Sequence, residues 1–587
     1  MAIKNQKIVA DFETTTTPED LRVWAVCAVD IGSLETVFID NSIDSFFKWL
    51  EDKNTICYFH NLKFDGEFIL SYLLSNGYTY SEEKKNKTFS TLITDMGIFY
   101  SITVIFEKQN KKYKKVTFYD SLKKLPFKVS QISEAFKLED KKLIIDYKAY
   151  RAPGHVLTEE ERDYIVNDCR IVANALQIQF GQGLTRMTNA SDAFNAYKKL
   201  TPYFDKWYPV LPIELDSDIR RSYRGGFVYL RPDRANVRGL QGITLDVNSL
   251  YPSVMYNCLL PVGYPMFFEG VPEPTEYWNL FIVRIKVKFD IKKDHLPTIQ
   301  IKGSFRFNPT EYLTTSKQGN DDEPVELVLT SVDLALFLDH YTIHDIKYLD
   351  GWMFHGVNGL FTEYINYWSH IKENSTGALR QLAKLMLNSL YGRFAMNPKG
   401  QKKIPMKDHD NIVRYTDDNV ELRDPIYTAM GCFITAYARE KTIRSGQRVY
   451  DRFIYADTDS LHLIGCEAPE DLDIHPKKLG YWKNEGTFTD SCYIRAKTYM
   501  ETMHETHERN LKTYVKILCN ESIERAEHIN GVIHSWETKV TCAGMPDNVK
   551  KKVTYDNFKS GSTFDGKLVP RRYPGGIILT ETTFTIK

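Results

Sequence analysis

The sequence has no excess of charge of either sign. Lys and Arg total 76 and Asp and Glu total 76 over 587 residues, so the formal net charge is zero. Any phosphate-binding surface must therefore come from local clusters of Lys and Arg rather than from a uniformly basic chain. The sequence also lacks an apolar signal core at its start and any apolar run long enough to span a bilayer, which predicts no membrane partner.

Paired cysteines are also missing. The nine cysteines are scattered, with no Cys-x-x-Cys spacing. This excludes a disulfide framework and a cysteine-based zinc site, and it fits a reducing compartment. Internal repeats and low-complexity tracts are absent as well. With 43% hydrophobic residues the composition is that of an ordinary globular protein, and the length predicts several domains.

Two carboxylates stand one residue apart in the stretch 455–460, Tyr-Ala-Asp-Thr-Asp-Ser. Short apolar runs on either side predict a β-hairpin with Asp457 and Asp459 at its tip. Like charges held this close repel, and a divalent cation such as Mg²⁺ would relieve the repulsion. A solvated acidic turn is the alternative interpretation of these six residues.

A second group of acids lies in the first third of the chain. Asp11 and Glu13 end a predicted strand and share one face, because strand side chains alternate. Asp65 stands at a strand–helix junction, where capping the helix is its alternative role. Tyr164 and Asp168 are four apart on a predicted helix and share a face. Two acids on one face of a buried strand need a metal ion or a cationic partner.

A polar stripe marks a helical pattern between residues 374 and 394. Arg380, Lys384, Asn388 and Tyr391 are spaced four, four and three apart and therefore lie in one line. Two cations, an amide and a ring in this order suit a triphosphate and its base. Ion pairing on a solvated helix face is the alternative.

A glycine pair occurs in the stretch 223–226, Tyr-Arg-Gly-Gly. Paired glycines let the backbone approach a ligand closely, and the neighbouring arginine can meet a phosphate. Such a pair more often marks only a turn.

Taken in order, these motifs resemble those of the family B DNA polymerases. The dispersed acids with Tyr-x-x-x-Asp resemble the three motifs of the DEDDy-type 3′→5′ exonucleases. DVNSLYP at 246–252 and KLMLNSLYG at 384–392 resemble the first two polymerase motifs, the acidic hairpin resembles the third, and Lys497-Thr498-Tyr499 resembles the motif that steadies the primer terminus. The stretches NLKFDG, YDSLKKLPF and KKLGYW resemble, more narrowly, the protein-primed polymerases of small tailed Bacillus phages.

This resemblance implies an α/β and α+β multidomain fold. A ribonuclease-H-like 3′→5′ exonuclease domain would precede a right-hand polymerase of palm, fingers and thumb with two insertions. The expected bounds are 1–185 for the exonuclease domain, 186–260 and 425–530 for the palm, 261–358 for insertion one, 359–395 for the fingers, 396–424 for insertion two and 531–587 for the thumb.

The resemblance also assigns roles at the exonuclease site. Metal ions would be held by Asp11, Glu13, Asp65 and Asp168, while Tyr164 orients the attacking water and Lys142 assists. The residues expected to grip the single-stranded primer end are Thr14, His60, Asn61, Phe64, Phe68, Ser121 and Leu122. Phe64 and Phe68 could equally be core residues.

At the polymerase site, the implied metal ligands are Asp246, Asp457, Asp459 and the carbonyl of Val247. The implied nucleotide-binding residues are Tyr251, Lys372, Arg380, Lys384, Asn388, Tyr391 and Gly392. The implied contacts to template and primer are Tyr223, Arg224, Gly225, Gly226, Lys497 and Tyr499.

The function implied is that of a replicative DNA polymerase with proofreading exonuclease, which initiates on a terminal protein and couples synthesis to strand displacement in phage genome replication. Each site would use two Mg²⁺ ions, with Mn²⁺ as a substitute. Expected partners are template–primer DNA, dNTPs, the terminal protein and a single-stranded-DNA-binding protein, and we expect a monomer in the cytoplasm of a bacterial host. A nucleic-acid-primed family B enzyme and a non-catalytic DNA-binding relic are the alternatives, and the intact acids argue against the relic.

Overall fold

The computed structural model describes residues 6–109, 112–147, 149–301, 311–317, 323–508, 517, 520, 522–530 and 532–587. Residues 302–310 and 318–322 of the expected insertion one lie outside the described residues, as do 509–516, 518, 519 and 521 of the expected palm. No helix within the described ranges is long and apolar enough to cross a membrane.

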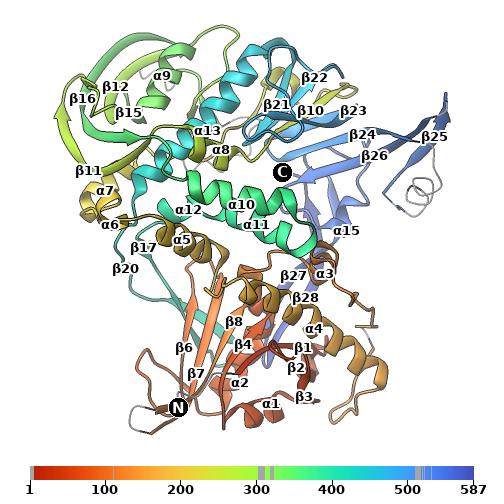
Figure 1. Ribbon diagram of the computed structural model, residues 1–587. Coiled ribbons are helices and arrows are strands. Elements are labelled where there is room, and N and C mark those ends of the chain that lie inside the picture. The colour runs from red at the N-terminus through yellow and green to blue at the C-terminus, as the bar shows by residue number, and fades with distance from the viewer. Residues whose placement is uncertain are drawn as a thin grey trace.

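The N-terminal domain is built on an eight-stranded mixed sheet (Figure 1). Its order is β3 (Thr36–Asp40), β2 (Val23–Asp30), β1 (Gln6–Thr14), β4 (Asn54–Phe59), β8 (Lys112–Asp120), β7 (Phe99–Gln109), β6 (Thr88–Ile93) and β5 (Thr79–Tyr80). Alternate residues of β2 face opposite layers, because Cys27 packs with α4 (Glu159–Gly181) and Val26 packs with α1 (Ile43–Leu50) and α2 (Leu62–Ser75). The helices thus cover both faces of the sheet.

A second eight-stranded sheet forms the palm. Its order is β25 (Arg525–Ile529), β26 (Val532–Cys542), β24 (Thr498–Glu508), β23 (Trp482–Arg495), β10 (Gly242–Val247), β22 (Ser460–Ile464), β21 (Phe453–Asp457) and β9 (Val228–Leu230). The buried helix α13 (Thr428–Arg448) and the shorter α8 (Leu250–Asn257) pack beside it. Because β26 pairs with β24, this sheet extends to Cys542, beyond the boundary expected at 530.

The segment between the palm strands forms a separate lobe. Four strands pair in the order β11 (Leu260–Glu269), β16 (Tyr341–Val357), β12 (Leu280–Ile291) and β15 (Val325–Thr330), with α9 (Ser331–His340) against them. Its sheet covers nearly the same range as the expected insertion one.

Two paired helices follow, α10 (Thr362–Asn374) and α11 (Gly377–Ser389), and a short α12 (Tyr391–Phe394) completes the fingers (Figure 1). The helical pattern predicted for 374–394 is therefore interrupted after Asn374 and at Leu390. Leu379 is 39% exposed because it lies in the first turn of α11.

Insertion two and the thumb are both built from β-hairpins. Insertion two pairs β17 (Lys399–Gly400) with β20 (Glu421–Leu422) and β18 (Lys403–Lys407) with β19 (Val413–Asp417). The thumb contains α15 (Asp547–Lys550) and the long hairpin of β27 (Thr563–Tyr573) and β28 (Gly576–Thr585). Both hairpin regions reach back to the N-terminal domain (Figure 1).

Candidate active sites

The predicted acidic hairpin is confirmed in the palm. β21 and β22 pair antiparallel, and Thr458 adopts φ +61° at the tip between Asp457 and Asp459. The backbone N–H of Val247 donates to the Asp459 carbonyl at 2.8 Å. This bond and the pairing of β10 with β22 place Asp246 beside the hairpin.

The carboxylates at this hairpin are not equally neutralised. Lys497 Nζ lies 2.8 Å from Asp457 Oδ2, so Asp457 has a cationic partner. Burial and the nearby Asp459 raise the pKa of Asp246 to about 7. Burial also raises the pKa of Asp459, with Asp457 adding to the shift. Lys483 and Lys497 offset these shifts only in part, so the pair Asp246 and Asp459 keeps an excess of negative charge.

This donor set fits a divalent cation. Within the described ranges, no three His, Cys, Asp or Glu side chains already converge as an ion site. However, two partly buried carboxylates with raised pKa values are what a hard cation stabilises, because it favours their ionised form. Whether the Val247 carbonyl joins them stays a prediction.

The fingers stripe faces the palm motif. The rings of Tyr251 and Tyr391 stack at 3.9 Å with an interplanar angle of 16°. Lys372 Nζ lies 2.9 Å from Ser249 Oγ, and Arg380 Nη1 donates to the Lys372 carbonyl at 2.6 Å. Thus α10, α11 and α8 meet at one place.

Positive charge is concentrated there. Burial lowers the pKa of Lys372, and Arg380 and Lys384 lower it further, so the three cations lie close together. Asn388 and Gly392 are exposed, and no described protein atom lies within 4 Å of where a Gly392 Cβ would stand. The structure therefore brings Tyr251 together with Tyr391, and Lys372 together with Arg380 and Lys384. That these residues bind a nucleotide stays a prediction.

Gly226 of the glycine pair lies against the acidic hairpin. A Cβ at Gly226 would lie 2.7 Å from Thr458 Oγ1 and 2.8 Å from Thr458 Cγ2. The Thr458 N–H also donates to the Phe227 carbonyl at 2.7 Å. Gly226 therefore lets the backbone of this loop lie close to the tip of the hairpin. Gly225 is exposed, and Tyr223 lies near Tyr391, which contributes to the raised pKa of Tyr223.

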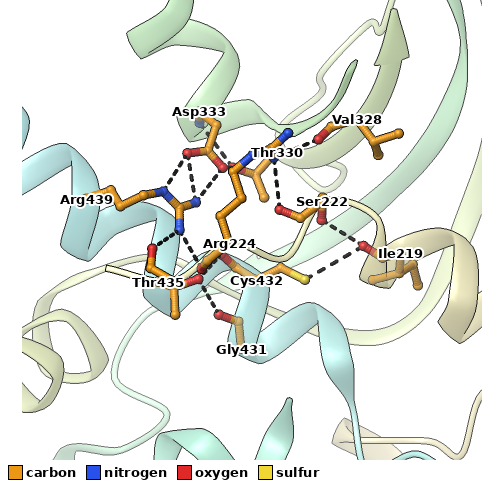
Figure 2. A network of polar contacts seen from close by, with 11 residues as sticks. Ile219, Ser222, Arg224, Val328, Thr330, Asp333, Gly431, Cys432, Thr435 and Arg439 are labelled. Atoms are coloured by element: carbon orange, nitrogen blue, oxygen red, sulfur yellow. Dashed lines mark hydrogen bonds and ion pairs between the residues drawn. The ribbon is translucent and has the colours of Figure 1, made fainter. Parts of the chain in front are cut away.

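Arg224 was predicted to meet DNA, and its placement contradicts this. Its side chain is 6% exposed and donates to the carbonyls of Ser222 at 3.1 Å and Val328 at 2.9 Å. Figure 2 shows it inside a network in which Arg439 of α13 pairs with Asp333 of α9 and donates to the Arg224 carbonyl at 2.7 Å. Arg224 therefore holds the shape of the loop from within.

The predicted exonuclease acids also come together. Asp11 and Glu13 share a face of β1, while Phe12 packs on the other side in the core. Burial and the neighbouring Asp168 raise the pKa of Asp11 to about 7. Burial and Asp11 raise the pKa values of Glu13 and Asp65.

Uncompensated oxygens remain in this cluster. Asp65 Oδ1 and Asp168 Oδ1 are buried without a hydrogen-bond partner among the described residues. Such atoms are costly unless a ligand satisfies them, so the four acids also fit divalent cations. The helix-capping alternative for Asp65 is wrong, because Asn61 is the N-cap of α2 and Asp65 lies inside the first turn.

Tyr164 and Lys142 stand beside these acids. Lys142 Nζ forms an ion pair with Asp168 and donates to Tyr164 Oη at 3.1 Å. The hydroxyl of Tyr147 is also hydrogen-bonded to Tyr164. Tyr147 carried no sequence signal, because its loop has no periodic pattern.

Several expected primer-binding residues have internal roles instead. The ring of His60 contacts Ser121 Oγ at 3.0 Å and the Phe127 carbonyl at 2.8 Å, so both of its nitrogens are engaged inside the protein. Ser121 is fully buried, and Phe68 is 2% exposed beneath Gly576 of the thumb. A direct DNA contact is therefore contradicted for Ser121 and Phe68, and the core alternative holds for Phe68.

Other primer-binding candidates remain accessible. Asn61 is exposed, and Thr14, Phe64 and Leu122 are half-buried. No sequence pattern singled out Asp120, whose Oδ1 accepts from the backbone N–H groups of Asn61 at 3.1 Å and Leu122 at 3.0 Å. Asp120 thus joins two predicted primer-binding segments.

Comparison with known proteins defines the class. Residues 48–153 and 145–475 match the family model for DNA polymerase type B, organellar and viral, and the chain belongs to this family. With the paired carboxylate sites, this makes the protein a DNA-directed DNA polymerase.

The individual relatives are phage enzymes. The chain is 44% identical to the DNA polymerase of Bacillus phage B103, over 98% of this chain and 99% of that protein, and 43% identical to that of Bacillus phage phi29, over 98% of both. The solved structure of Phi29 DNA polymerase complexed with primer-template DNA matches over 100% of both chains, with a TM-score of 0.91 at 40% identity. The sequence resemblance and the expected fold class are thereby confirmed.

Proposed function

We propose that this polymerase replicates a phage genome, starting on a terminal protein, proofreading with its N-terminal domain and displacing the strand ahead of it. The observation that carries the proposal is the presence in one chain of two separate groups of carboxylates whose charge is offset only in part, one on β1, α2 and α4 and the other at the palm hairpin.

At the palm, Asp246, Asp457 and Asp459, with the Val247 carbonyl, would hold the divalent cations. Bound there, Mg²⁺ or Mn²⁺ lowers the pKa of a primer 3′-hydroxyl and neutralises the triphosphate. Lys372, Arg380 and Lys384 bind the phosphates by charge-assisted hydrogen bonds. The rings of Tyr251 and Tyr391 stack on each other. They would form the floor of the sugar and base site, where Tyr251 would exclude a ribose 2′-hydroxyl.

At the primer end, Lys497 and Tyr499 hold the terminal nucleotide, and Asn388 and Gly392 shape the nucleotide pocket. Lys497 Nζ lies 2.8 Å from Asp457 Oδ2 and would turn from this carboxylate to the primer phosphate when the substrate binds.

At the N-terminal site, Asp11, Glu13, Asp65 and Asp168 would hold the ions that activate water and stabilise the leaving 3′-oxygen. The Tyr164 hydroxyl orients the attacking water. Lys142, already paired with Asp168, keeps the tyrosine in place and offsets charge on the phosphate. Asn61, Thr14, Phe64 and Leu122 grip the frayed strand.

Separating the two activities tests the assignment. Asp459→Ala should reduce primer extension to background and leave degradation of single-stranded DNA intact, because only the palm site loses a ligand. Asp11→Ala with Asp65→Ala should do the reverse. Loss of both activities in either variant, with the melting temperature unchanged, would show that the two sites are not independent.

Initiation on a protein is tested by the product. Incubation with the terminal protein, template and labelled dATP should leave deoxyadenylate covalently attached to the protein. If the label enters only nucleic-acid-primed products, the alternative of a nucleic-acid-primed family B polymerase is correct. Insertion one is the region we assign to terminal-protein binding, and a single-stranded-DNA-binding protein is the partner for the displaced strand.

A further inference from the structure

Three parts of the chain that are far apart in sequence meet at one point. Arg572, near the end of β27 in the thumb, donates from Nε and Nη2 to Glu67 Oε1 of α2, each at 2.8 Å. The same guanidinium lies 4.7 Å from the ring centroid of Tyr415, on β19 of insertion two. We call this contact of Glu67, Arg572 and Tyr415 the thumb joint.

Apolar packing surrounds the thumb joint. Ile577 and Ile578 of the thumb and Val413 of insertion two belong to the same buried cluster as Phe68 of α2. A Cβ at Gly576 would overlap the Phe68 ring, so the thumb turn sits directly on the helix. The joint is therefore a packed contact rather than a chance surface ion pair.

The charge at the joint is poorly solvated. Glu67 is fully buried, and no hydrogen-bond partner for its Oε2 is found among the described residues. While the joint is closed, the charge of the Glu67 carboxylate is stabilised by Arg572, and when the joint opens the carboxylate regains water. Arg572 is partly exposed, so its own charge depends less on Glu67.

The joint closes a circuit of domains. The N-terminal domain connects to the palm through α5 (Asn189–Leu200) and α7 (Ile213–Arg220), the palm continues through β26 into the thumb, and the thumb turn returns to α2 (Figure 1). Insertion two, which leaves and re-enters between α12 and α13, joins the same point. A DNA strand that passes through this circuit cannot leave sideways while the joint is closed.

We propose that Glu67 and Arg572 are positioning residues that latch the thumb and insertion two onto the N-terminal domain and keep DNA enclosed between successive nucleotide additions. This inference rests on the proposed function of long, strand-displacing synthesis. Neither residue touches the reacting atoms, so the latch governs how many nucleotides are added per binding event and leaves each addition unchanged.

The asymmetry of the pair gives a specific signature. Arg572→Gln leaves a buried carboxylate without its cation and should open the joint. Glu67→Gln removes the buried charge, so its effect alone should be small. The double variant, Glu67→Gln with Arg572→Gln, should recover most of what Arg572→Gln loses. A residue that acted only by attracting DNA phosphates would not be rescued in this way.

The experiment extends a primed single-stranded circle with Mg²⁺ and an excess of unlabelled trap DNA, so that each product reports one binding event. We expect Arg572→Gln to shorten the median product at least about fivefold, and the double variant to return to within about twofold of wild type. Single-nucleotide addition on a short primed template should be equal in all variants. The matched control is Arg571→Gln, which removes the same charge from the exposed neighbouring residue on β27.

The outcomes separate the two claims. If Arg571→Gln shortens products as much as Arg572→Gln, or if Glu67→Gln gives no rescue, the latch is wrong. If the wild type itself makes no product longer than one copy of the template circle, the proposed strand-displacing function fails. In that case the latch is judged by hydrogen exchange of 573–576, which it predicts to be faster in Arg572→Gln than in the wild type and the double variant. Unchanged exchange would overturn it.

Discussion

At the scale of single residues, both sites are groups of carboxylates whose positive partners are lysines. Lys497 pairs with Asp457 in the palm, and Lys142 pairs with Asp168 in the N-terminal domain. In each case the remaining acids keep raised pKa values because burial and like charge oppose ionisation. The lysines thus offset part of the repulsion between the carboxylates and leave a deficit of positive charge, which a divalent cation removes.

This deficit predicts a pH-dependent metal requirement for degradation. The pKa of Asp11 is raised to about 7, and a cation must displace the proton that the carboxyl carries below that value. The Mg²⁺ concentration for half-maximal degradation should therefore fall at least about tenfold per unit as pH rises toward 7, because the raised pKa values of Glu13 and Asp65 add to the effect of Asp11. Mg²⁺ titrations at several pH values with single-stranded DNA measure this. A half-maximal concentration that stays constant across the range would contradict it.

At the scale of elements, the catalytic hairpin depends on the loop at 223–226. The backbone of this loop is fixed by Arg439, which donates to the carbonyls of Arg224 at 2.7 Å and Gly225 at 2.9 Å (Figure 2). This places Gly226 against the hairpin tip, where there is no space for a side chain beside Thr458. The loop therefore sets the position of Asp457 and Asp459.

Gly226→Ala should accordingly impair synthesis alone. Overpacking of this kind costs about 1–3 kcal/mol, and a hairpin shifted by it should lower primer extension about tenfold or more. Degradation of single-stranded DNA should be unchanged. Adding Thr458→Gly should restore extension, because it removes the clashing atoms at a residue whose φ of +61° suits glycine. If the double variant is no better than Gly226→Ala, the clash is not the cause.

The comparison of sequence and structure is most informative at this scale. Asp457 and Asp459 were predictable as the tip of a hairpin between two apolar runs, and Asp246 was predictable from the motif that it opens. The stripe from Arg380 to Tyr391 was predictable from helical spacing. The internal roles of Arg224 and Ser121 were not predictable, and the core position of Phe68 was predicted only as one of two equal alternatives. Each is buried by a partner remote in sequence, Val328 for Arg224, His60 for Ser121 and Gly576 for Phe68, and local patterns carry no information about such partners.

At the scale of the whole molecule, insertion two is attached to the N-terminal domain as well as to the palm. The Asp95 N–H donates to the Gln401 carbonyl at 3.0 Å, and Lys407 Nζ lies 2.6 Å from Ser75 Oγ. Its two ends stay close to α7, because Arg220 donates to the Ala395 carbonyl at 2.7 Å and also bonds to Thr428. Insertion two can therefore be removed without pulling the fingers and the palm apart.

Replacing residues 397–424 by a short Gly-Ser linker tests what insertion two does. We expect the variant to fill a gap on an open template at the wild-type rate, because the residues of both sites remain. It should stop at the 5′ end of a downstream strand that the wild type displaces. The deletion also removes Tyr415 from the thumb joint. Substrates short enough to be copied in one binding event distinguish a defect in strand displacement from this weakening of the joint. If the variant passes through the downstream duplex as readily as the wild type, strand displacement belongs to another part of the molecule.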